Sequence, residues 1–223
     1  GLAFDGDADR CFVIDELGQP VTPSAVAAIV AKREIERARA NGAIGDIHVI
    51  HNLITSRSVP ETIEAAGGIP VRTQVGHSLI KDRMRETGAI FGGEHSAHYY
   101  FRDFWGADNG MLAAMHLISQ FGEYDGPLSR LAAEFTPYSS SGELNSTVTD
   151  VPAAYTRIVE AFAGRGEFDE LDGLTVSGAA DDGFWWFNVR PSNTEPLLRL
   201  NAEAATPATM ALVRDEVLAL IRG

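Results

Sequence analysis

Three aspartates alternate near the start of the sequence, at Asp5, Asp7 and Asp9. Gly6 lies between the first two and lets the backbone turn tightly, so the three carboxylates can converge on one hard divalent cation. Arg10 follows at once, and a cation beside an arginine suggests chemistry on a phosphate ester. A compact loop of three carboxylates suits the small, octahedral Mg²⁺, with a phosphate oxygen as a further ligand.

A calcium-binding EF-hand loop is the first alternative for this segment. Such a loop needs a helix on each side, glycine at its sixth position and a bidentate glutamate at its twelfth. Glu16 falls at the twelfth position, but Arg10 occupies the sixth, and the apolar run 11–14 is typical of a strand. The pattern therefore excludes an EF-hand and leaves an acidic surface turn as the alternative to a metal loop.

A second polar segment, residues 92–98, follows a short apolar run that is typical of a strand. Ligands of parallel α/β sheets bind beyond the carboxyl ends of the strands. Glu94, Ser96 and His98 are suitable partners for sugar hydroxyls. A metal site through His95 and His98 is possible by spacing alone, and a polar loop with satisfied histidines is the other alternative.

A third polar segment covers residues 190–196. Arg190 can grip a phosphate through two parallel hydrogen bonds, and free backbone N–H groups can complete the cradle. Its polar neighbours there are Ser192, Asn193 and Thr194. The spacing of Ser192 and Glu195 also fits a helix capping box, but the alternating pattern of 197–203 is typical of a strand. An exposed turn is the remaining alternative.

A weaker signal lies at Gly76 and His77, where a helix is expected to begin after a strand. The N–H groups of a helix N-terminus face an anion well, and His77 could reach a ligand. Lys81 is as readily a solvated helix residue as a ligand group.

The elements that would position these segments alternate between helix and strand from Thr22 to about Gly93, and two more helices complete this domain. Thr22 followed by Pro23 is an N-cap with proline at the first helical position, and Asn41-Gly42 ends that helix. Further helices are expected at 58–66, 78–87, 111–121 and 128–135, and strands at 48–50, 71–75 and 89–91. Strands separated by helices of about ten residues predict a parallel α/β sheet.

A turn-rich stretch, residues 137–142, then marks a boundary. Beyond it, strands are expected at 144–148, 174–176, 184–189 and 197–203, and helices at 152–163 and from 207 to the end. The predicted fold class is therefore α/β, with a parallel α/β sheet domain followed by a smaller α+β domain.

The composition is that of a globular protein, with 45% hydrophobic and 22% charged residues among 223. No apolar run approaches the roughly 18–20 residues of a membrane span. The net charge of −13 argues against nucleic acid as a partner. The single cysteine, Cys11, lies in an apolar run and is expected to be a reduced core residue. A cytoplasmic setting fits these features.

Together and in this order, the motifs make the chain resemble the C-terminal half of an α-D-phosphohexomutase, the superfamily of phosphomannomutases and phosphoglucomutases. Residues 5–10, 93–98 and 190–196 are similar to its magnesium, sugar-binding and phosphate-binding loops. The resemblance covers essentially the whole chain. It implies the tail of the second domain at 1–19, the third, sugar-binding domain at 20–137 and the fourth, phosphate-binding domain at 138–223.

The resemblance also implies an activity. A phosphoserine in the first domain would donate phosphate to a mannose or glucose phosphate, giving a hexose 1,6-bisphosphate that reorients and returns the other phosphate. Mg²⁺ would be the cofactor, held by the three aspartates with Arg10 beside it. Glu94 and Ser96 would hold sugar hydroxyls, with His77 near them, and the 190–196 loop would clamp the phosphate that is not reacting. His98 is a candidate for proton transfer.

The missing N-terminal domains of the same protein are an expected partner, because these 223 residues contain no phosphoserine loop. The chain alone is therefore expected to be inactive. Asn193 and the run from His95 to Arg102 resemble a phosphomannomutase/phosphoglucomutase more than a phosphoglucosamine mutase. A non-catalytic sugar-phosphate-binding module is the alternative from another class. A metal-dependent phosphatase is less favoured, since it leaves the loop at 190–196 unexplained.

Two departures from the family pattern stand out. Ala97 occupies a position where the family usually has glycine. The lysine or arginine that many members carry after the strand at 48–50 has no obvious equivalent, and either His51 or Arg57 could replace it. Under this reading the three loops must face one shared cleft.

Overall fold

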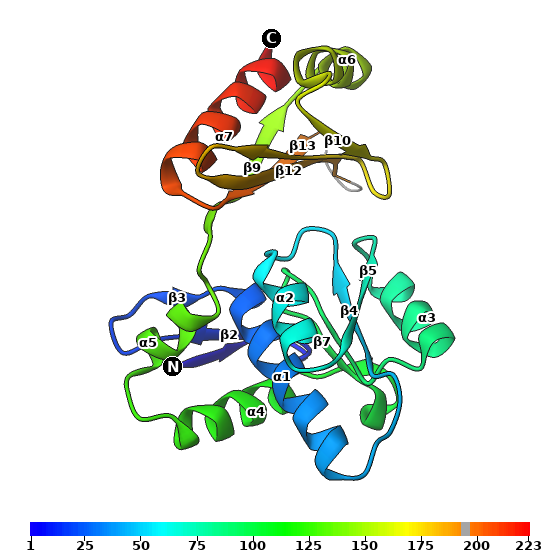
Figure 1. The fold of residues 1–223 in the computed structure, drawn as a ribbon, viewed down its shortest axis with the longest axis vertical. Coiled ribbons are helices and arrows are strands. Elements are labelled where there is room, and N and C mark those ends of the chain that lie inside the picture. Colours follow the sequence, from blue (N-terminus) through cyan, green and yellow to red (C-terminus); the bar gives the residue numbers. More distant parts are fainter. Residues whose placement is uncertain (193–196) are drawn as a thin grey trace. The chain divides into compact units, whose positions relative to one another are not determined.

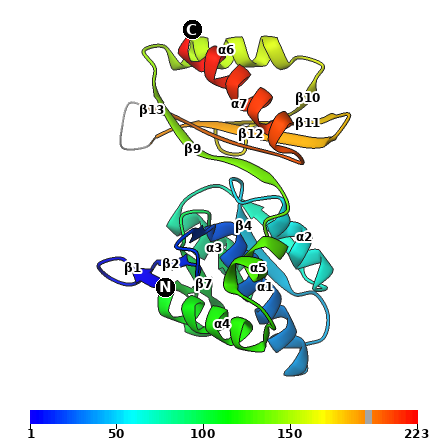
Figure 2. The ribbon, with the colours of Figure 1, turned by 90° about the vertical axis from the view of Figure 1, so that its left-hand side faces the viewer.

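The computed structural model describes residues 1–192 and 197–223, so Asn193 and Thr194 lie outside the described residues. The chain divides into two compact units, residues 1–137 and residues 138–223 (Figures 1 and 2). Each unit combines helices with strands, which confirms the predicted α/β fold class. Within the described ranges, no helix combines the length and the apolar character needed to cross a membrane.

The helices of the first unit are α1 (Pro23–Ala40), α2 (Ser58–Ala65), α3 (His77–Thr87), α4 (Gly110–Glu123), α5 (Leu128–Glu134) and the short 3₁₀ helix η1 (Arg102–Phe104). Capping residues lie at the ends of several of these helices. The Thr22 hydroxyl caps α1 by accepting from the N–H of Ala25 at 3.2 Å, as predicted. The Asn109 side chain caps α4, and Gly88 ends α3 with a φ of 67°.

The main sheet of this unit has the strand order β5-β4-β6-β7-β8. Its strands are β4 (His48–Asn52), β5 (Ile69–Thr73), β6 (Phe91–Gly93), β7 (Tyr99–Phe101) and β8 (Ala107–Asp108). β4 is parallel to β5 and β6, whereas β7 and β8 continue the sheet in antiparallel pairs. The sheet is therefore mixed and not wholly parallel, because residues 94–98 are too few for a crossover helix.

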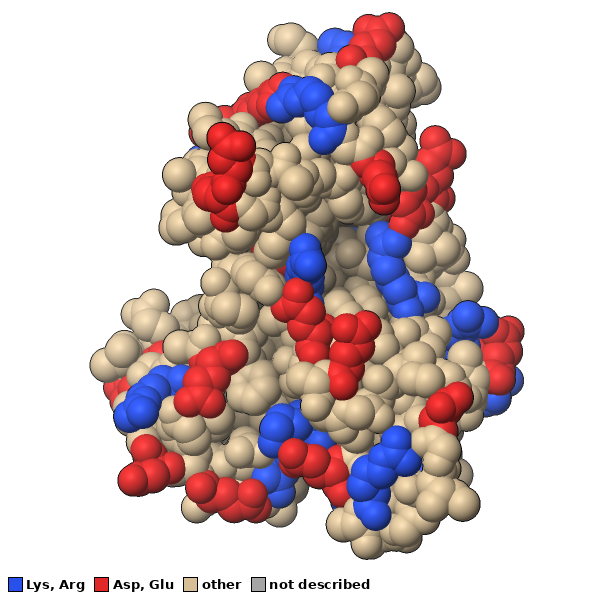
Figure 3. Space-filling model, in the orientation of Figure 1, with Lys and Arg blue, Asp and Glu red and all other residues tan. Residues whose placement is uncertain are grey.

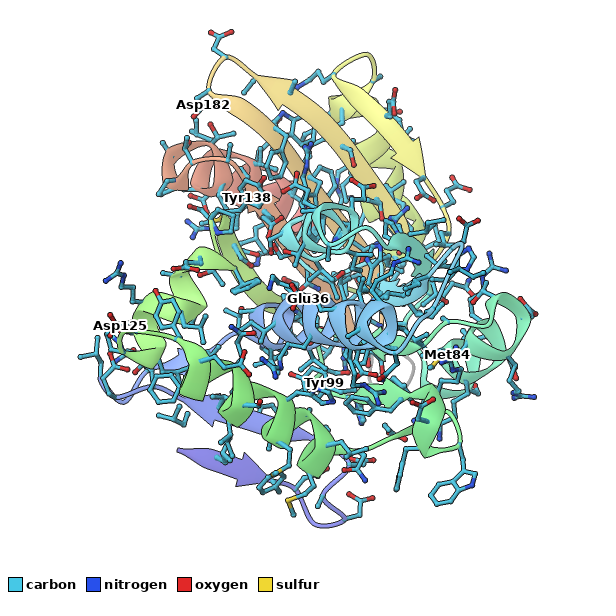
Figure 4. The ribbon with its side chains drawn as sticks, turned by 60° about the horizontal axis from the view of Figure 1, so that its bottom comes forward. Glu36, Met84, Tyr99, Asp125, Tyr138 and Asp182 are labelled. Carbon is cyan, nitrogen blue, oxygen red and sulfur yellow. The ribbon has the colours of Figure 1, made fainter. Side chains whose placement is uncertain are left out.

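Alternating residues of the strands face two layers of helices. Val49 shares a core with α1, α2 and α4, while its neighbour Ile50 packs with Ile80 of α3 on the other face. Tyr99 belongs to the first of these cores and is fully buried. Figure 4 shows it beneath α1, with Met84 on α3 well apart from it. This two-sided burial fixes the register and leaves the carboxyl ends of β4 and β6 open to the loops that follow.

A small antiparallel sheet precedes this domain, formed by β1 (Leu2–Phe4), β2 (Cys11–Ile14) and β3 (Pro20–Val21). Cys11 and Val13 lie in the same core as α1 and α4. Burial raises the pKa of the Cys11 thiol to about 11, which fits an inert core cysteine. The assignment of residues 1–19 to a preceding domain stays a prediction.

The second unit is an antiparallel sheet with the order β10-β11-β12-β13-β9 and two helices. Its elements are β9 (Ser139–Thr147), α6 (Val151–Phe162), β10 (Gly166–Asp169), β11 (Leu174–Ala180), β12 (Gly183–Pro191), β13 (Leu197–Ala204) and α7 (Pro207–Arg222). Both helices lie on one face of the sheet (Figure 2). Phe162 and Val217 of the helices and Phe187 of the sheet are fully buried there.

Acidic and basic side chains are interspersed over the face of each unit seen in Figure 3. Several charged residues of the first unit form ion pairs within a helix, such as Lys32–Glu36 and Arg57–Glu61. Exposed pairs of this kind contribute little to stability.

Candidate functional site

The aspartate loop is the turn that joins β1 to β2, with the Ala8 N–H donating to the Asp5 carbonyl at 3.2 Å. Arg10 holds Asp5 through two hydrogen bonds, from its backbone N–H at 3.2 Å and from its Nε at 2.7 Å. Desolvation would raise the pKa of Asp5, but these bonds from Arg10 outweigh it and leave the pKa below its usual value. Asp5 is therefore a fixed carboxylate.

The carboxylates of Asp5, Asp7 and Asp9 each offer an oxygen within 4.8 Å of the others. Among the described residues, Asp9 Oδ1 is buried and accepts no hydrogen bond. Burial raises the pKa of Asp9, and the like charges of Asp5 and Asp7 add to the effect, against the influence of His98. A set of three convergent oxygens with an unsatisfied acceptor fits a hard divalent cation such as Mg²⁺.

The aspartate loop and the 92–98 loop are joined by their backbones, although about 90 residues separate them. Arg10 and His98 form an isolated antiparallel bridge, and the Cys11 N–H donates to the Ala97 carbonyl at 3.4 Å. From the other side, the Gly110 N–H donates to Ala8 at 3.1 Å. A Cβ on Gly110 would lie 2.5 Å from the Arg10 carbonyl oxygen, so only glycine permits this approach of α4.

Glu94 lies at the carboxyl end of β6 and is buried, with 2% of its surface exposed. Asn52 donates to its Oε1 at 3.2 Å, and the Tyr100 hydroxyl donates to its Oε2 at 2.8 Å. The approach of α1 to this strand needs Gly93, where a Cβ would lie 2.7 Å from that of Ala27. Glu94, which the sequence predicts to bind a sugar hydroxyl, is thus a buried carboxylate held in place by Asn52 and Tyr100.

Ser96 and His98 complete this loop. The Ser96 hydroxyl lies 2.9 Å from His98 Nδ1, and His98 Nε2 lies 3.8 Å from Asp9 Oδ1. Ala97, between them, is fully buried and adopts a φ of 69°, the left-handed region that favours glycine. The departure from the family pattern at this position is therefore a strained alanine. His95 instead contacts α1, where its Nδ1 lies 2.9 Å from the Ser24 hydroxyl.

His77 and Lys81 of α3 belong to the same neighbourhood. Lys81 Nζ lies 2.7 Å from His77 Nε2, and Tyr100 Oη lies 3.2 Å from His77 Nδ1. Asp108 of β8 lies 3.2 Å from His77 and 3.3 Å from Lys81. Tyr100 and Asp108 are polar residues of the site that the sequence did not single out. They are neighbours only through the register of β7 and β8, which no motif signals.

Of the two residues that could replace the missing lysine or arginine, His51 is buried at the end of β4, and its Nδ1 lies 2.9 Å from the Thr55 hydroxyl. Burial lowers the pKa of His51 to about 4, so its imidazole is neutral at pH 7. Arg57 pairs with Glu61 at 2.8 Å on α2. Neither arrangement reproduces a free cation at the loop after β4.

In the second unit, Arg190 lies within β12 and is 7% exposed. Its cross-strand partner is Arg199 of β13, and both lie near Glu143, at 3.7 and 3.4 Å. Arg199 also donates to the Ser192 hydroxyl at 3.1 Å. Within the described ranges, Arg190 Nε is buried and makes no hydrogen bond. Arg199 of β13 is a second arginine beside Arg190 that the motif did not reveal.

The first unit thus brings together the predicted residues Asp5, Asp7, Asp9, Arg10, His77, Glu94, Ser96 and His98. The predicted residues Arg190 and Ser192 lie in the second unit. That all three loops face one cleft stays a prediction.

Comparison with known protein families identifies the class. A family model described as phosphoglucomutase/phosphomannomutase, alpha/beta/alpha domain III, matches residues 22–138. The model of the C-terminal domain of the same family matches residues 143–220. The chain belongs to this family, within the α-D-phosphohexomutase superfamily, and corresponds to its C-terminal portion. The resemblance inferred from the motifs is confirmed.

Individual relatives agree with this assignment. A phosphomannomutase of Methanocaldococcus jannaschii is 40% identical over 221 residues, which are 99% of this chain and 47% of that protein. A protein of Xanthomonas campestris named phosphohexose mutases is 38% identical over 228 residues, covering 100% of this chain and 48% of its own length. The chain spans about half the length of the curated relatives that it matches.

Solved structures share the fold. A phosphoglucomutase/phosphomannomutase family protein from Burkholderia thailandensis superimposes with a TM-score of 0.81 at 30% identity, over 99% of this chain and 45% of that one. An Aspergillus fumigatus N-acetylphosphoglucosamine mutase, solved with GlcNAc-6P and magnesium, has a TM-score of 0.70 at 16% identity, over 99% and 48%. The second likeness shows the fold alone.

Proposed function

We propose that the chain is the metal- and sugar-binding part of a phosphomannomutase/phosphoglucomutase, acting with a phosphoserine-bearing N-terminal half. The whole enzyme would move phosphate reversibly between C6 and C1 of mannose or glucose phosphates through a hexose 1,6-bisphosphate. The observation that carries the proposal is the joining of the aspartate loop to the Glu94–His98 loop through the Arg10–His98 bridge and the Cys11–Ala97 hydrogen bond. A phosphate-directed cation and sugar-directed polar groups would then act on one molecule.

Asp5, Asp7 and Asp9 would hold Mg²⁺, which when bound neutralises charge on a transferring phosphoryl group. Arg10 would lie beside the reacting phosphate, and its two hydrogen bonds to Asp5 would keep the loop in one conformation. A preorganised loop loses little freedom when the ligand arrives.

Glu94 and Ser96 would accept hydrogen bonds from sugar hydroxyls, and His77 would lie at the edge of the same surface. Glu94 is suited to this because Tyr100 and Asn52 fix its orientation. His98 would transfer a proton at Nε2, since its Nδ1 is engaged with Ser96 at 2.9 Å. In the second unit, Arg190 and Ser192, together with Asn193 and Thr194, would bind the phosphate that is not reacting, so that binding energy away from the reaction positions the reacting group.

The test is a calorimetric titration of glucose 1,6-bisphosphate into the chain at saturating Mg²⁺. We expect binding in the wild type and a loss of about tenfold or more in Glu94→Gln, the usual effect of removing a charged hydrogen-bond partner. Glu86→Gln on α3 is the matched control, since Glu86 pairs only with Arg83 among the ion pairs that the structure describes. Ser96→Ala, at an exposed position, provides a second variant if Glu94→Gln does not fold.

The proposal would be contradicted if the wild type did not bind the bisphosphate, or if Glu94→Gln and Ser96→Ala both bound it with the affinity of the wild type. Turnover is tested by adding the N-terminal half of a related phosphomannomutase to the chain. Conversion of mannose 1-phosphate to mannose 6-phosphate indicates the proposed enzyme, and conversion of glucosamine phosphate alone indicates a phosphoglucosamine mutase. Binding of the bisphosphate without any isomerised product in that mixture indicates a sugar-phosphate-binding module.

A further inference from the structure

A cavity of about 370 Å³ lies between the C-terminal part of α3 and the loop that joins β7 to β8. Part of its lining is apolar, formed by Met84 (labelled in Figure 4) and Ala89, which are both buried in the core between α3 and the sheet. Gly88 and Gly106 line it with backbone, and a Cβ on either would meet no atom within 4 Å. The volume falls in the range of roughly 300–1,000 Å³ that is typical of small-molecule pockets.

This cavity lies at the other end of the sheet from the sugar-directed loop. Ala89 lines the cavity and precedes β6, whereas Glu94 follows the carboxyl end of that strand. The three residues of β6 span about 10 Å, at roughly 3.3 Å per residue. Lys81 is shared by the two neighbourhoods, since it lines the cavity while its Nζ lies 2.7 Å from His77 Nε2. The other charged and aromatic residues of the cavity come from the end of α3 and from the β7–β8 loop.

The charges that line the cavity are positive. Arg85 of α3 and Arg102 of η1 line it together with Lys81, and its lining includes no carboxylate in the part of the chain that the structure describes. Arg85 pairs with Asp82, and Arg102 Nε lies 3.5 Å from Asp103, but these four side chains are between 54% and 76% exposed. Exposed pairs are weak, so an anion can displace the two carboxylates. A group of cations on a chain of net charge −13 indicates an anionic ligand.

Trp105 adds an aromatic surface to the same cavity. It is 88% exposed, although aromatic residues usually bury most of their surface. It follows η1 with a φ of 56°, in the left-handed region that is unfavourable for a bulky side chain. Two other non-glycine residues among those described have a positive φ, Ala8 and Ala97, and both lie in loops of the candidate site. Exposure and strain together indicate that the indole contacts a ligand.

A protein partner is the competing explanation for an exposed tryptophan. A tryptophan that anchors a protein interface usually inserts into a pocket of the partner. Here the cavity belongs to this chain, and Trp105 lines it beside two arginines. A small ligand can therefore enter next to the indole and reach the guanidinium groups at the same time.

We propose that this cavity binds a nucleotide, with its base stacked on the indole of Trp105 and its phosphates at Arg85 and Arg102. An indole stacks with any base, because every base has a π face. A guanidinium group binds phosphate through two parallel hydrogen bonds. A nucleotide carries an aromatic ring and phosphates in one molecule, so it uses both features of the cavity. The site goes beyond the proposed hexose-phosphate activity and shares none of its aspartates.

The experiment is a calorimetric titration of ADP into the whole chain without Mg²⁺, so that no metal at the aspartate loop can recruit the phosphates. We expect Trp105→Ala to weaken ADP binding roughly 5- to 150-fold, the range for loss of one stacked base, and Trp105→Phe to retain most of it. Arg102→Gln should weaken binding about tenfold or more, as for loss of a charged hydrogen bond. Arg83→Gln is the matched control on α3, since Arg83 pairs with Glu86 at 3.0 Å.

ADP should also bind more tightly than pyrophosphate or adenosine, each of which lacks one half of the nucleotide. No binding of ADP, or equal affinity in Trp105→Ala and the wild type, would overturn the proposal. If Trp105→Ala does not fold, Arg102→Gln replaces it, and unchanged ADP affinity in that variant has the same meaning.

Two further arms separate this cavity from other surfaces. Arg190→Ala should retain ADP binding, and a loss would assign the nucleotide to the arginine pair of the second unit and overturn the proposal. Adding the N-terminal half of a related phosphomannomutase should leave ADP binding unchanged, whereas a loss would show that Trp105 belongs to a protein interface instead. These readouts involve neither Mg²⁺ nor a hexose phosphate, so failure here leaves the titration with glucose 1,6-bisphosphate unaffected.

Discussion

The acidic site of the first unit and the arginine pair of the second unit place charge by different means. In the first unit, loops distant in the sequence are joined by single backbone contacts, such as the bridge between Arg10 and His98. In the second, Arg190 and Arg199 face each other because they are register partners on neighbouring antiparallel strands. Both share the counter-charge of Glu143.

The difference indicates which kind of substitution would disturb each site. A strand pair keeps its geometry as long as the ladder of hydrogen bonds keeps its register, so a side chain can be exchanged without moving its neighbours. A site assembled from loops depends on how closely particular backbones approach, and Gly110 permits one such approach. We therefore expect a backbone change at such an approach to destabilise the first unit, whereas a side-chain exchange in the second unit should change ligand binding without moving its neighbours.

The largest expected effect concerns His51, which is neutral because it is buried. Its pKa is about 4 in the folded chain against an ordinary 6.5, so the unfolded chain binds more protons between these values. Stability is then complete above pH 6.5 and falls as the pH is lowered toward 4, by at most about 3 kcal/mol from this residue. Urea unfolding at several pH values should show a flatter pH profile for His51→Gln than for the wild type.

The comparison isolates His51, because burial also lowers the pKa of His116 and that residue is unchanged in both proteins. Parallel pH profiles for His51→Gln and the wild type would show that His51 is not held neutral by the fold.

The next effect belongs to the second unit. Arg190→Ala should weaken hexose-phosphate binding by about 1.5–3 kcal/mol, the usual range for a charged hydrogen bond. Arg214→Ala on α7 is the control, since that arginine pairs with the neighbouring Asp215 at 2.8 Å. Calorimetry with glucose 1,6-bisphosphate measures both. Unchanged binding in Arg190→Ala would remove this loop from the proposed site.

A backbone change in the first unit comes third. Gly110→Ala should destabilise the chain by about 1–3 kcal/mol, because its Cβ would meet the backbone of Arg10 at 2.5 Å. Gly122→Ala on the same helix has open space and should stabilise by up to about 1 kcal/mol. Thermal unfolding of the two variants gives the sign directly. A stabilised Gly110→Ala would mean that α4 does not approach the aspartate loop this closely.

The smallest effect is expected at Ala97. Glycine there would relieve a left-handed φ of 69°, worth roughly 1 kcal/mol. It would also remove a buried methyl group, worth about 0.8 kcal/mol, so the two changes nearly cancel. Ala97→Gly should shift the free energy of unfolding by less than about 0.5 kcal/mol. A large loss of stability would show that packing of the methyl group, and not backbone strain, dominates at this position.

Much of the fold could be predicted from the sequence because its signals are local. The Thr22 cap and the apolar stripe of α1 gave a helix within one residue of its observed end. Several strands were found but displaced, as at β5, predicted two residues late, whereas β10 was not predicted. The hairpin of β7 and β8 was missed, because Tyr99–Phe101 is buried on both faces and has no alternating pattern.

The chemistry of the candidate site could be predicted from the types of its residues. Carboxylates at alternating positions are typical of cation binding, and an arginine in a polar loop is typical of phosphate binding. Their partners were not. Tyr100, Asp108 and Arg199 enter only through strand pairing. Among the described residues Asp9 Oδ1 has no hydrogen-bond donor, and the nearby Arg10 Nε donates to Asp5 instead. Sequence determined which groups can bind a cation or a phosphate, because that is a property of each side chain. Tertiary structure alone decided which of them meet and which remain unsatisfied, because distance and burial arise only when the chain packs.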